Sequence, residues 1–283
     1  MRSRGIKRRI AGRDSMDGAG VRIKRSVGAS QFARIDPFLM LDNFSSDNPD
    51  DYIAGFPAHP HRGFETVTYM IEGRMRHRDH MGNEGILRSG GVQWMTAGRG
   101  VIHEEMPEQE EGLMSGFQLW INLPAAEKMK PAAYQNIEPE EVAEFDAAEG
   151  VHVRLVAGQL MDIGGSSQVG PVNGISRQPL FAEIQMQPNT RYTLPVPAEL
   201  SGFVYLFEGG ARLPNEPLNL AEAAELDGGD QVDLQAGMGG ARLLIVAAKA
   251  IGEPIAQYGP FVMNTHDEIE QAISDYQANR LTG

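Results

Sequence analysis

Two pairs of metal-ligating residues give this chain its clearest chemical signal. His59 and His61 stand two residues apart, and residues two apart on a strand point to the same side, roughly 6.6 Å apart along it. About forty residues later, His103 and Glu105 repeat this spacing. We therefore expect two facing strands that bring three imidazoles and one carboxylate to a single metal ion.

A second carboxylate competes for the fourth position at this ion. Glu65 has the same strand parity as His61, so spacing alone does not choose between Glu65 and Glu105. Neutral imidazoles with one carboxylate suit iron(II) and also copper, nickel, manganese or zinc, because ligand types alone do not select among these metals. Four protein ligands leave open positions on a five- or six-coordinate ion, where water, O2 or a chelating substrate can bind.

The remaining histidines give weaker signals. His77 and His80 lie near an expected turn among charged residues, and the simplest interpretation is that both are solvated. His77 also shares the parity of Met75, which leaves the alternative that it faces the cavity beside the ligands. His152 and His266 have no partner at ligand spacing, so we interpret both as structural.

The segments around these residues have the pattern of short strands. The chain contains 33 glycines and 17 prolines, with short alternating apolar runs between them, as is typical of many-stranded antiparallel proteins. A hairpin is expected where Glu72-Gly73 joins two of the runs. One helix is expected over Asp267–Arg280, capped by Asn264-Thr265. The predicted strands are Phe64–Glu72, Arg74–His80, Val92–Ala97, Val101–Met106 and Met114–Leu123.

Short strings repeat between the two halves of the chain. Tyr69–Gly73 resembles Tyr205–Gly209, and Gly90–Gln93 resembles Gly228–Gln231 at nearly the same spacing, which indicates two similar β-barrels. Shifted by this spacing, the four ligand positions fall on residues that bind no metal, so we expect one ion per chain. These residues are Pro195, Pro197, Ala241 and Leu243.

Composition excludes several classes of site. The 283-residue chain has no cysteine, and therefore no disulfide, no cysteine-ligated metal and no thiol nucleophile. No apolar run approaches the roughly 20 residues that a membrane helix needs, and the N-terminus lacks the apolar core of a signal peptide. We therefore expect a soluble, cytoplasmic protein with no membrane partner.

Charge is unevenly distributed along the chain. The net charge is −13, yet nine basic residues lie within the first 25. Attraction to phosphate depends on the whole electrostatic field, and the acidic body opposes it, so we do not expect direct nucleic-acid binding. We expect the basic arm to be solvated or paired within the protein.

Longer strings resemble one known family. They surround the candidate ligands and continue near both ends of the chain. They are Asp36–Leu39, His59–Val67, Gln93–Gly100, Glu105–Pro107, Gln118–Leu123 and Tyr258–Thr265. On these strings the chain resembles the pirin family of the cupin superfamily. The resemblance implies an all-β bicupin, that is, two antiparallel β-sandwich or jelly-roll barrels with a short C-terminal helix. We place the metal-binding cupin in residues 1–135 and a metal-free cupin with the terminal helix in residues 136–283.

The resemblance also implies a metal site and an activity. Carried over by position, the pirin ligands are His59, His61, His103 and Glu105, usually of one Fe2+ ion, whereas Glu65 lies outside the coordination sphere. Pirin-like proteins resemble quercetin 2,3-dioxygenases, which open the flavonol ring with O2 and release carbon monoxide. The expected partners are a flavonol-like molecule and O2, with Glu105 as the catalytic base. The alternative is a regulator without turnover, whose iron state alters its binding to a transcription factor or metabolic enzyme.

Overall fold

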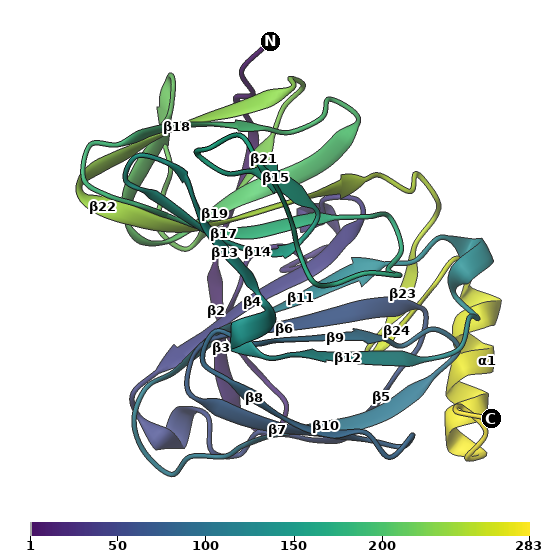
Figure 1. Cartoon of the computed structure of the whole chain (residues 1–283). Coiled ribbons are helices and arrows are strands. Elements are labelled where there is room, and N and C mark those ends of the chain that lie inside the picture. The colour runs from purple at the N-terminus through teal and green to yellow at the C-terminus, as the bar shows by residue number, and fades with distance from the viewer. Residues whose placement is uncertain (1) are drawn as a thin grey trace. The chain divides into compact units, whose positions relative to one another are not determined.

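The computed structural model describes residues 2–283, which form two compact units built almost entirely from β-strands (Figure 1). The histidine unit, which carries the candidate ligands, consists of residues 14–25, 38–139 and 251–283. The second unit consists of residues 2–13, 26–37 and 140–250. The expected all-β class with antiparallel sheets and a short C-terminal helix is confirmed. Among residues 2–283, no helix is long and apolar enough to cross a membrane.

Two antiparallel sheets of the histidine unit hold the site residues. The larger has the strand order β12-β9-β6-β11-β4-β3-β2, and the smaller has the order β5-β10-β7-β8. The strands of the larger sheet are β2 (Arg13–Asp17), β3 (Val21–Arg25), β4 (Phe38–Ser46), β6 (Phe64–Glu72), β9 (Val92–Thr96), β11 (Met114–Asn122) and β12 (Ala133–Ile137). Those of the smaller sheet are β5 (Phe56–His61), β7 (Arg74–Asp79), β8 (Glu84–Arg88) and β10 (Val101–Pro107).

The expected hairpin at Gly73 is wrong, although both of its strands are present. β6 pairs with β9 and β11, whereas β7 pairs with β8 and β10. Gly73, at φ +102°, therefore turns the chain from one sheet into the other. The two sheets face each other, because the Thr68 hydroxyl on β6 donates to the Glu105 carboxylate on β10. The site residues lie between these sheets.

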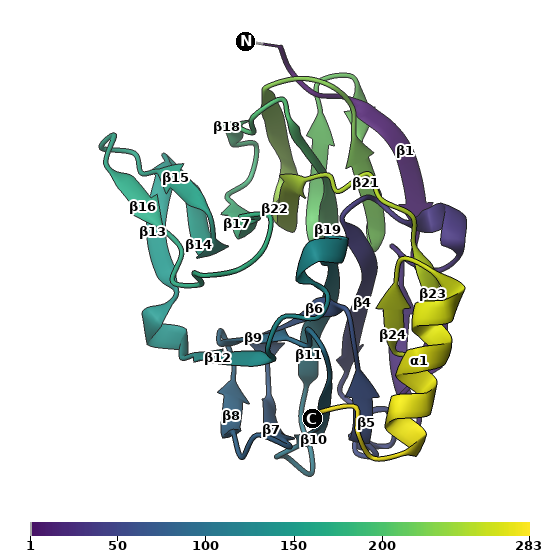
Figure 2. The ribbon, with the colours of Figure 1, turned by 90° about the vertical axis from the view of Figure 1, so that its right-hand side faces the viewer.

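The C-terminal segment packs within the histidine unit. β23 (Ala256–Tyr258) pairs with β24 (Phe261–Met263), and α1 (His266–Gln277) lies beside them (Figure 2). The expected cap is confirmed, since the Thr265 side chain accepts a hydrogen bond from the Glu268 N–H. Ile269 of α1 shares an apolar cluster with Ile102 of β10. The structure therefore differs from the expected division after residue 135, which assigned this helix to the second barrel.

The second unit has its own sheet and core. Its sheet has the order β1-β21-β19-β22-β17-β14-β13, with β18 paired to β22, β20 paired to β19, and β15-β16 as a separate hairpin. Leu155, Ile184, Val204 and Ile245 are fully buried between its strands. The strands are β1 (Ile6–Ala11), β13 (Ala143–Ala148), β14 (Val151–Ala157), β15 (Gln159–Met161), β16 (Ser167–Val169), β17 (Leu180–Met186), β18 (Arg191–Pro195), β19 (Leu200–Leu213), β20 (Glu216–Pro217), β21 (Glu222–Leu226) and β22 (Gln231–Lys249). Short 3-10 helices of the chain lie at Gln31–Ala33, Pro49–Asp51, Ala125–Glu127 and Pro139–Glu141.

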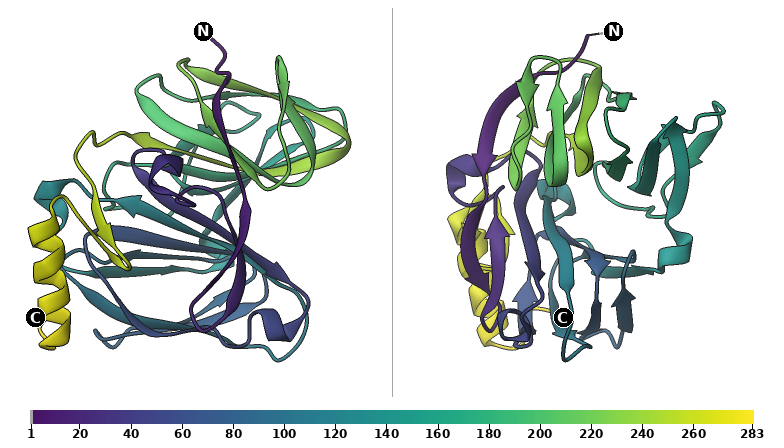
Figure 3. Two further views of the ribbon diagram at one scale, coloured as in Figure 1. Left: turned by 180° about the vertical axis from the view of Figure 1, so that it is seen from behind. Right: turned by 90° about the vertical axis from the view of Figure 1, so that its left-hand side faces the viewer.

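The basic N-terminal arm, residues 2–25, contributes strands to both units and is purple in Figure 3. Its first strand, β1, pairs with β21 along the edge of the second sheet, whereas β2 and β3 belong to the larger sheet of the histidine unit. Lys7 and Arg8 both form ion pairs with Glu225, and Arg9 pairs with Glu222 at 2.8 Å. The internal pairing that the charge pattern predicted is therefore present, and it offsets much of the positive charge of this arm.

Candidate metal centre

Two neighbouring strands bring three histidines together. β5 and β10 pair so that His59 stands opposite His103 and His61 stands opposite Val101. The imidazole centroids are 4.7 Å apart for His59 and His61, 4.4 Å for His59 and His103, and 4.9 Å for His61 and His103. One ring nitrogen from each of the three lies within 4.8 Å of the other two. Among residues 2–283, no other group of three His, Cys, Asp or Glu side chains converges in this way.

The protonation states of these histidines fit a cation. His59 Nδ1 lies 2.8 Å from the Pro57 carbonyl oxygen, and its Nε2 lies 3.0 Å from His61 Nε2. The tautomer of His59 that donates to Pro57 through Nδ1 has the lone pair of Nε2 on the His61 side. The buried Nε2 of His103 has no hydrogen-bond partner. Burial lowers the pKa of His61 and His103 well below the usual range, and the neighbouring imidazoles lower it further. Neutral imidazoles with inward lone pairs are the donors that a divalent metal ion requires.

Glu105 lies between the sheets close to this cluster. It is only 4 % exposed. Its Oε1 accepts from the Thr68 hydroxyl at 2.8 Å, and its Oε2 accepts from the Gln118 side-chain amide at 3.4 Å. The group of ring nitrogens within 4.8 Å of one another does not include this carboxylate. The role of Glu105 as the fourth ligand therefore stays a prediction.

Glu65 lies on the other face of its strand. On β6, Phe64 contacts His61 and Thr68 contacts Glu105, so the alternating Glu65 points away from the histidines. The parity argument fails because Gly63, at φ +91°, interrupts the alternation between β5 and β6. Of the two carboxylates that spacing left open, the structure thus places Glu105 on the histidine side.

The buried Glu65 carboxylate has partners of its own. It accepts hydrogen bonds from the Thr96 hydroxyl at 2.9 Å and the Trp94 indole N–H at 3.3 Å, and it pairs with Lys130 at 3.4 Å. Burial raises the pKa of Glu65, and these three partners oppose that rise. These partners satisfy the Glu65 carboxylate on the side of β6 that faces away from the histidines.

The simplest expectation for His77 is wrong, and its alternative describes the structure. His77 is buried, with its Nδ1 3.5 Å from the Nδ1 of His103. Its ring stacks on Tyr134 at 4.4 Å between centroids, and its Nε2 lies 3.6 Å from Asp79. His80 is exposed, as expected. The parity that His77 shares with the buried Met75 was the signal that could have found it.

An aromatic wall that sequence reasoning missed borders the cluster. The His61 ring lies 5.1 Å from Phe64 and 5.3 Å from Trp120, and the two apolar rings lie 4.3 Å apart. The two polar side chains that hold Glu105, Thr68 and Gln118, were also missed. Their signal was present, because they occupy strand positions on the histidine-facing side of β6 and β11.

The second unit carries apolar residues at the corresponding positions. β18 pairs with the first half of β22 as β5 pairs with β10, and the inward residues of that pairing are core residues of the unit. These residues are Tyr192, Leu194, Leu234 and Ala236. A fixed shift in sequence had matched the four candidate ligands to Pro195, Pro197, Ala241 and Leu243. The register of β18 and β22 matches them instead to this set of core residues. Neither set supplies a metal ligand.

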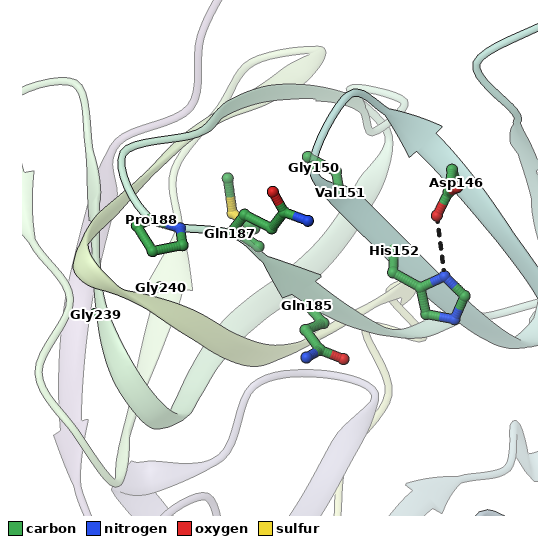
Figure 4. A pocket seen from close by; sticks show the side chains of 10 residues that line it. Asp146, Gly150, Val151, His152, Gln185, Gln187, Pro188, Gly239 and Gly240 are labelled. Carbon is green, nitrogen blue, oxygen red and sulfur yellow. Dashed lines mark hydrogen bonds and ion pairs between the residues drawn. The ribbon is translucent and has the colours of Figure 1, made fainter.

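The second unit also contains a pocket of about 380 Å³, shown in Figure 4. Its wall includes His152, whose Nδ1 lies 3.1 Å from the Asp146 carboxylate, together with Gln185 and Gln187. A single imidazole with an exposed carboxylate is a weak metal site, so this contact fits the structural role expected for His152. His266 is exposed at the start of α1.

Comparison with known proteins settles the family. Residues 20–121 match the family described as Pirin, and residues 181–282 match the Pirin C-terminal cupin domain. The chain belongs to the pirin family. A pirin-like protein of Caulobacter vibrioides is 42% identical over 272 residues, covering 96% of this chain and 97% of that protein.

Two further proteins that are similar to this pirin have names that state an activity. A Pseudomonas aeruginosa protein named "putative quercetin 2,3-dioxygenase" is 51% identical over 269 residues, covering 94% of each chain. The crystal structure of a quercetin 2,3-dioxygenase from Acinetobacter baumannii superposes with a TM-score of 0.90 at 30% identity, covering 99% of both chains. The expected bicupin architecture is therefore confirmed.

Proposed function

We propose that this pirin is a quercetin 2,3-dioxygenase-type enzyme that holds one divalent metal ion, foremost Fe2+, with His59, His61, His103 and Glu105. The observation that carries the proposal is the buried convergence of three imidazole nitrogens beside a carboxylate and an aromatic wall. The similarity to named quercetin 2,3-dioxygenases supports the substrate class, a flavonol together with O2. Copper, nickel, manganese and zinc suit the same donors, so metal analysis decides between them.

The bound ion would supply an electrophilic site for the flavonol 3-hydroxyl and its O2 chemistry. Glu105 would take the proton of that hydroxyl. The Thr68 hydroxyl and the Gln118 amide donate to the Glu105 carboxylate. The same two contacts fix the direction of the carboxylate, so the base is oriented before the substrate arrives.

Phe64 and Trp120 would position the flavonol. Trp120 is partly exposed next to His61, and the fully buried Phe64 supports its ring from behind. Flat aromatic substrates pack well on such an apolar ring. Burying the flavonol there excludes water from the reacting ring, which strengthens the electrostatic effect of the nearby charged groups. The aromatic wall thus complements the chemistry of Glu105.

Turnover by the metal-loaded protein tests this proposal. With quercetin under air, we expect O2-dependent loss of flavonol absorbance together with release of carbon monoxide. Glu105→Ala should abolish turnover while partly retaining the metal, and His61→Ala should lose both. His80→Ala changes an exposed histidine and serves as the control. Full flavonol cleavage by Glu105→Ala would refute the assignment of the base.

The alternative is a regulator that turns over no substrate. The depth of the site favours it, because His61, His103 and Glu105 are each at most 4 % exposed, which leaves little open surface for a bulky flavonol. A change of iron charge would then act on the surrounding loops and on a protein partner. A partner retained only by the metal-loaded protein, with no loss of quercetin, would favour this alternative over the enzyme.

A further inference from the structure

The residues next to both histidine-bearing strands form hydrogen bonds or close contacts with the C-terminal segment, residues 251–283. β5 ends at His61, and β10 begins at Val101, two residues before His103. The connections just outside these strand ends contact β24 and the chain that follows α1 (Figure 2).

Arg62 makes the most extensive of these contacts. It directly follows His61, and its side chain is 4 % exposed. Its Nη1 donates to Asp275 Oδ2 at 2.8 Å, its Nη2 donates to the Leu281 carbonyl at 3.2 Å, and its Nε donates to the Arg99 carbonyl. One guanidinium therefore joins the end of β5, the approach to β10, the last turns of α1 and the terminal tail.

Main-chain contacts reinforce the same junction. The Val262 N–H donates to the Arg62 carbonyl at 3.0 Å. A Cβ atom at Gly63 would lie 2.0 Å from the Val262 carbonyl oxygen, and one at Gly100 would lie 2.2 Å from the Leu281 carbonyl oxygen. Only glycine allows such close backbone approach. The C-terminal segment is thus fitted against both histidine-bearing strands at the point where each adjoins the site.

We propose that residues 251–283 are a positioning element of the metal centre, in which Asp275 acts through Arg62 to hold the β5 and β10 histidines at ligand spacing. This inference rests on the proposed metal site. Groups that orient ligands without touching the ion commonly control metal affinity. Coupling between two sites is reciprocal. If the ordered tail raises the affinity for the ion by some factor, a bound ion must shift the equilibrium towards the ordered tail by the same factor.

A Co2+ titration followed by the visible spectrum tests the role of Asp275. We expect Asp275→Asn to lower Co2+ affinity by about 10- to 100-fold and to alter the spectrum, and Asp275→Glu to recover part of the loss. Glu183→Gln is the matched control, because Glu183 is a buried carboxylate that pairs with Arg242 at 2.7 Å in the second unit. Equal affinity of Asp275→Asn and the wild type, or equal losses in Asp275→Asn and Glu183→Gln, would overturn the inference.

Hydrogen exchange of the unmodified protein gives a test that needs no variant. We expect Co2+ to slow exchange of the amides of residues 278–283, several of which bond back to α1, and to leave the β15–β16 hairpin of the second unit unchanged. Unchanged exchange in the tail when Co2+ is bound would contradict the coupling between the tail and the metal centre, but it would leave the proposed metal site standing. Failure of the wild type to bind Co2+ at all would instead remove the proposed metal site, and with it this inference.

Discussion

Lys128 is a buried cation whose charge is linked to the stability of the site's surroundings. Its ammonium group donates to the Gly63 carbonyl at 2.7 Å, to Asn122 Oδ1 at 2.7 Å and to the Val262 carbonyl at 2.9 Å. Burial lowers the pKa of Lys128 to about 8 from its ordinary value of 10.5. At neutral pH the group is therefore charged, and three N–H donors match three oxygen acceptors.

The lowered pKa of Lys128 predicts how stability depends on pH. Between about pH 8 and 10.5 the unfolded chain holds more protons on this amine than the folded chain does, so rising pH favours the folded state. We expect the free energy of unfolding of the wild type, relative to Lys128→Met, to rise by up to about 1.4 kcal/mol per pH unit in this range. Urea unfolding of both proteins from pH 7 to 10 measures it, and parallel curves would contradict the assignment.

The positions of individual site residues could be predicted where the argument depends on a single strand. His59 and His61 share β5, and alternation along that strand places both on the same side. The same rule failed for Glu65, because the left-handed Gly63 separates it from β5. His77 was hidden by the charged residues on either side of it, whose side chains point outward while its own ring is buried.

The turn between β5 and β6 is the element on which the site geometry depends most directly. Gly63 has φ +91°, and an added Cβ would lie 2.0 Å from the Val262 carbonyl oxygen. Gly82 has a similar φ of +85° with open space around it. A side chain at either position incurs backbone strain of about 1–3 kcal/mol, but only Gly63 would add a clash with the backbone.

Gly63→Ala should therefore destabilise the protein more than Gly82→Ala does. We expect an additional loss of about 2 kcal/mol or more in the free energy of unfolding, because the neighbouring β24 backbone cannot easily move away. Urea denaturation of the two variants and the wild type provides the comparison. Equal losses in the two variants would show that the Gly63 turn can relax.

Strands were easier to predict than their partners. The alternation along residues 64–72 located β6, and the turn signal at Glu72-Gly73 located the start of β7, but neither shows which strand lies alongside. A hairpin at Gly73 was expected because neighbouring strands usually pair, whereas here the chain crosses between two sheets. The cap of α1 was predictable because Thr265 and Glu268 act locally, within one turn of helix.

At the scale of the whole molecule, dividing the sequence at a single residue could not give the two units, because each unit contains three separate segments of the chain. β1 pairs with β21, so that Ile10 stands opposite Ala223, and the C-terminal segment packs in the histidine unit. Repeated strings indicated two similar barrels. Such short strings do not show which barrel the N-terminal and C-terminal segments of the chain join. Such long-range pairings depend on burial summed over the folded chain.

The two units predict a stoichiometry for the whole chain. Ligand atoms converge in one place among residues 2–283, and the matching inward positions of the second unit are the apolar Tyr192, Leu194, Leu234 and Ala236. We expect elemental analysis of the iron-reconstituted protein to give one chelator-removable equivalent per chain, and none for His61→Ala. An ion at 100 times its dissociation constant should add about 2.7 kcal/mol to the free energy of unfolding. Two removable equivalents, or an equal gain in stability by His61→Ala, would contradict a single site.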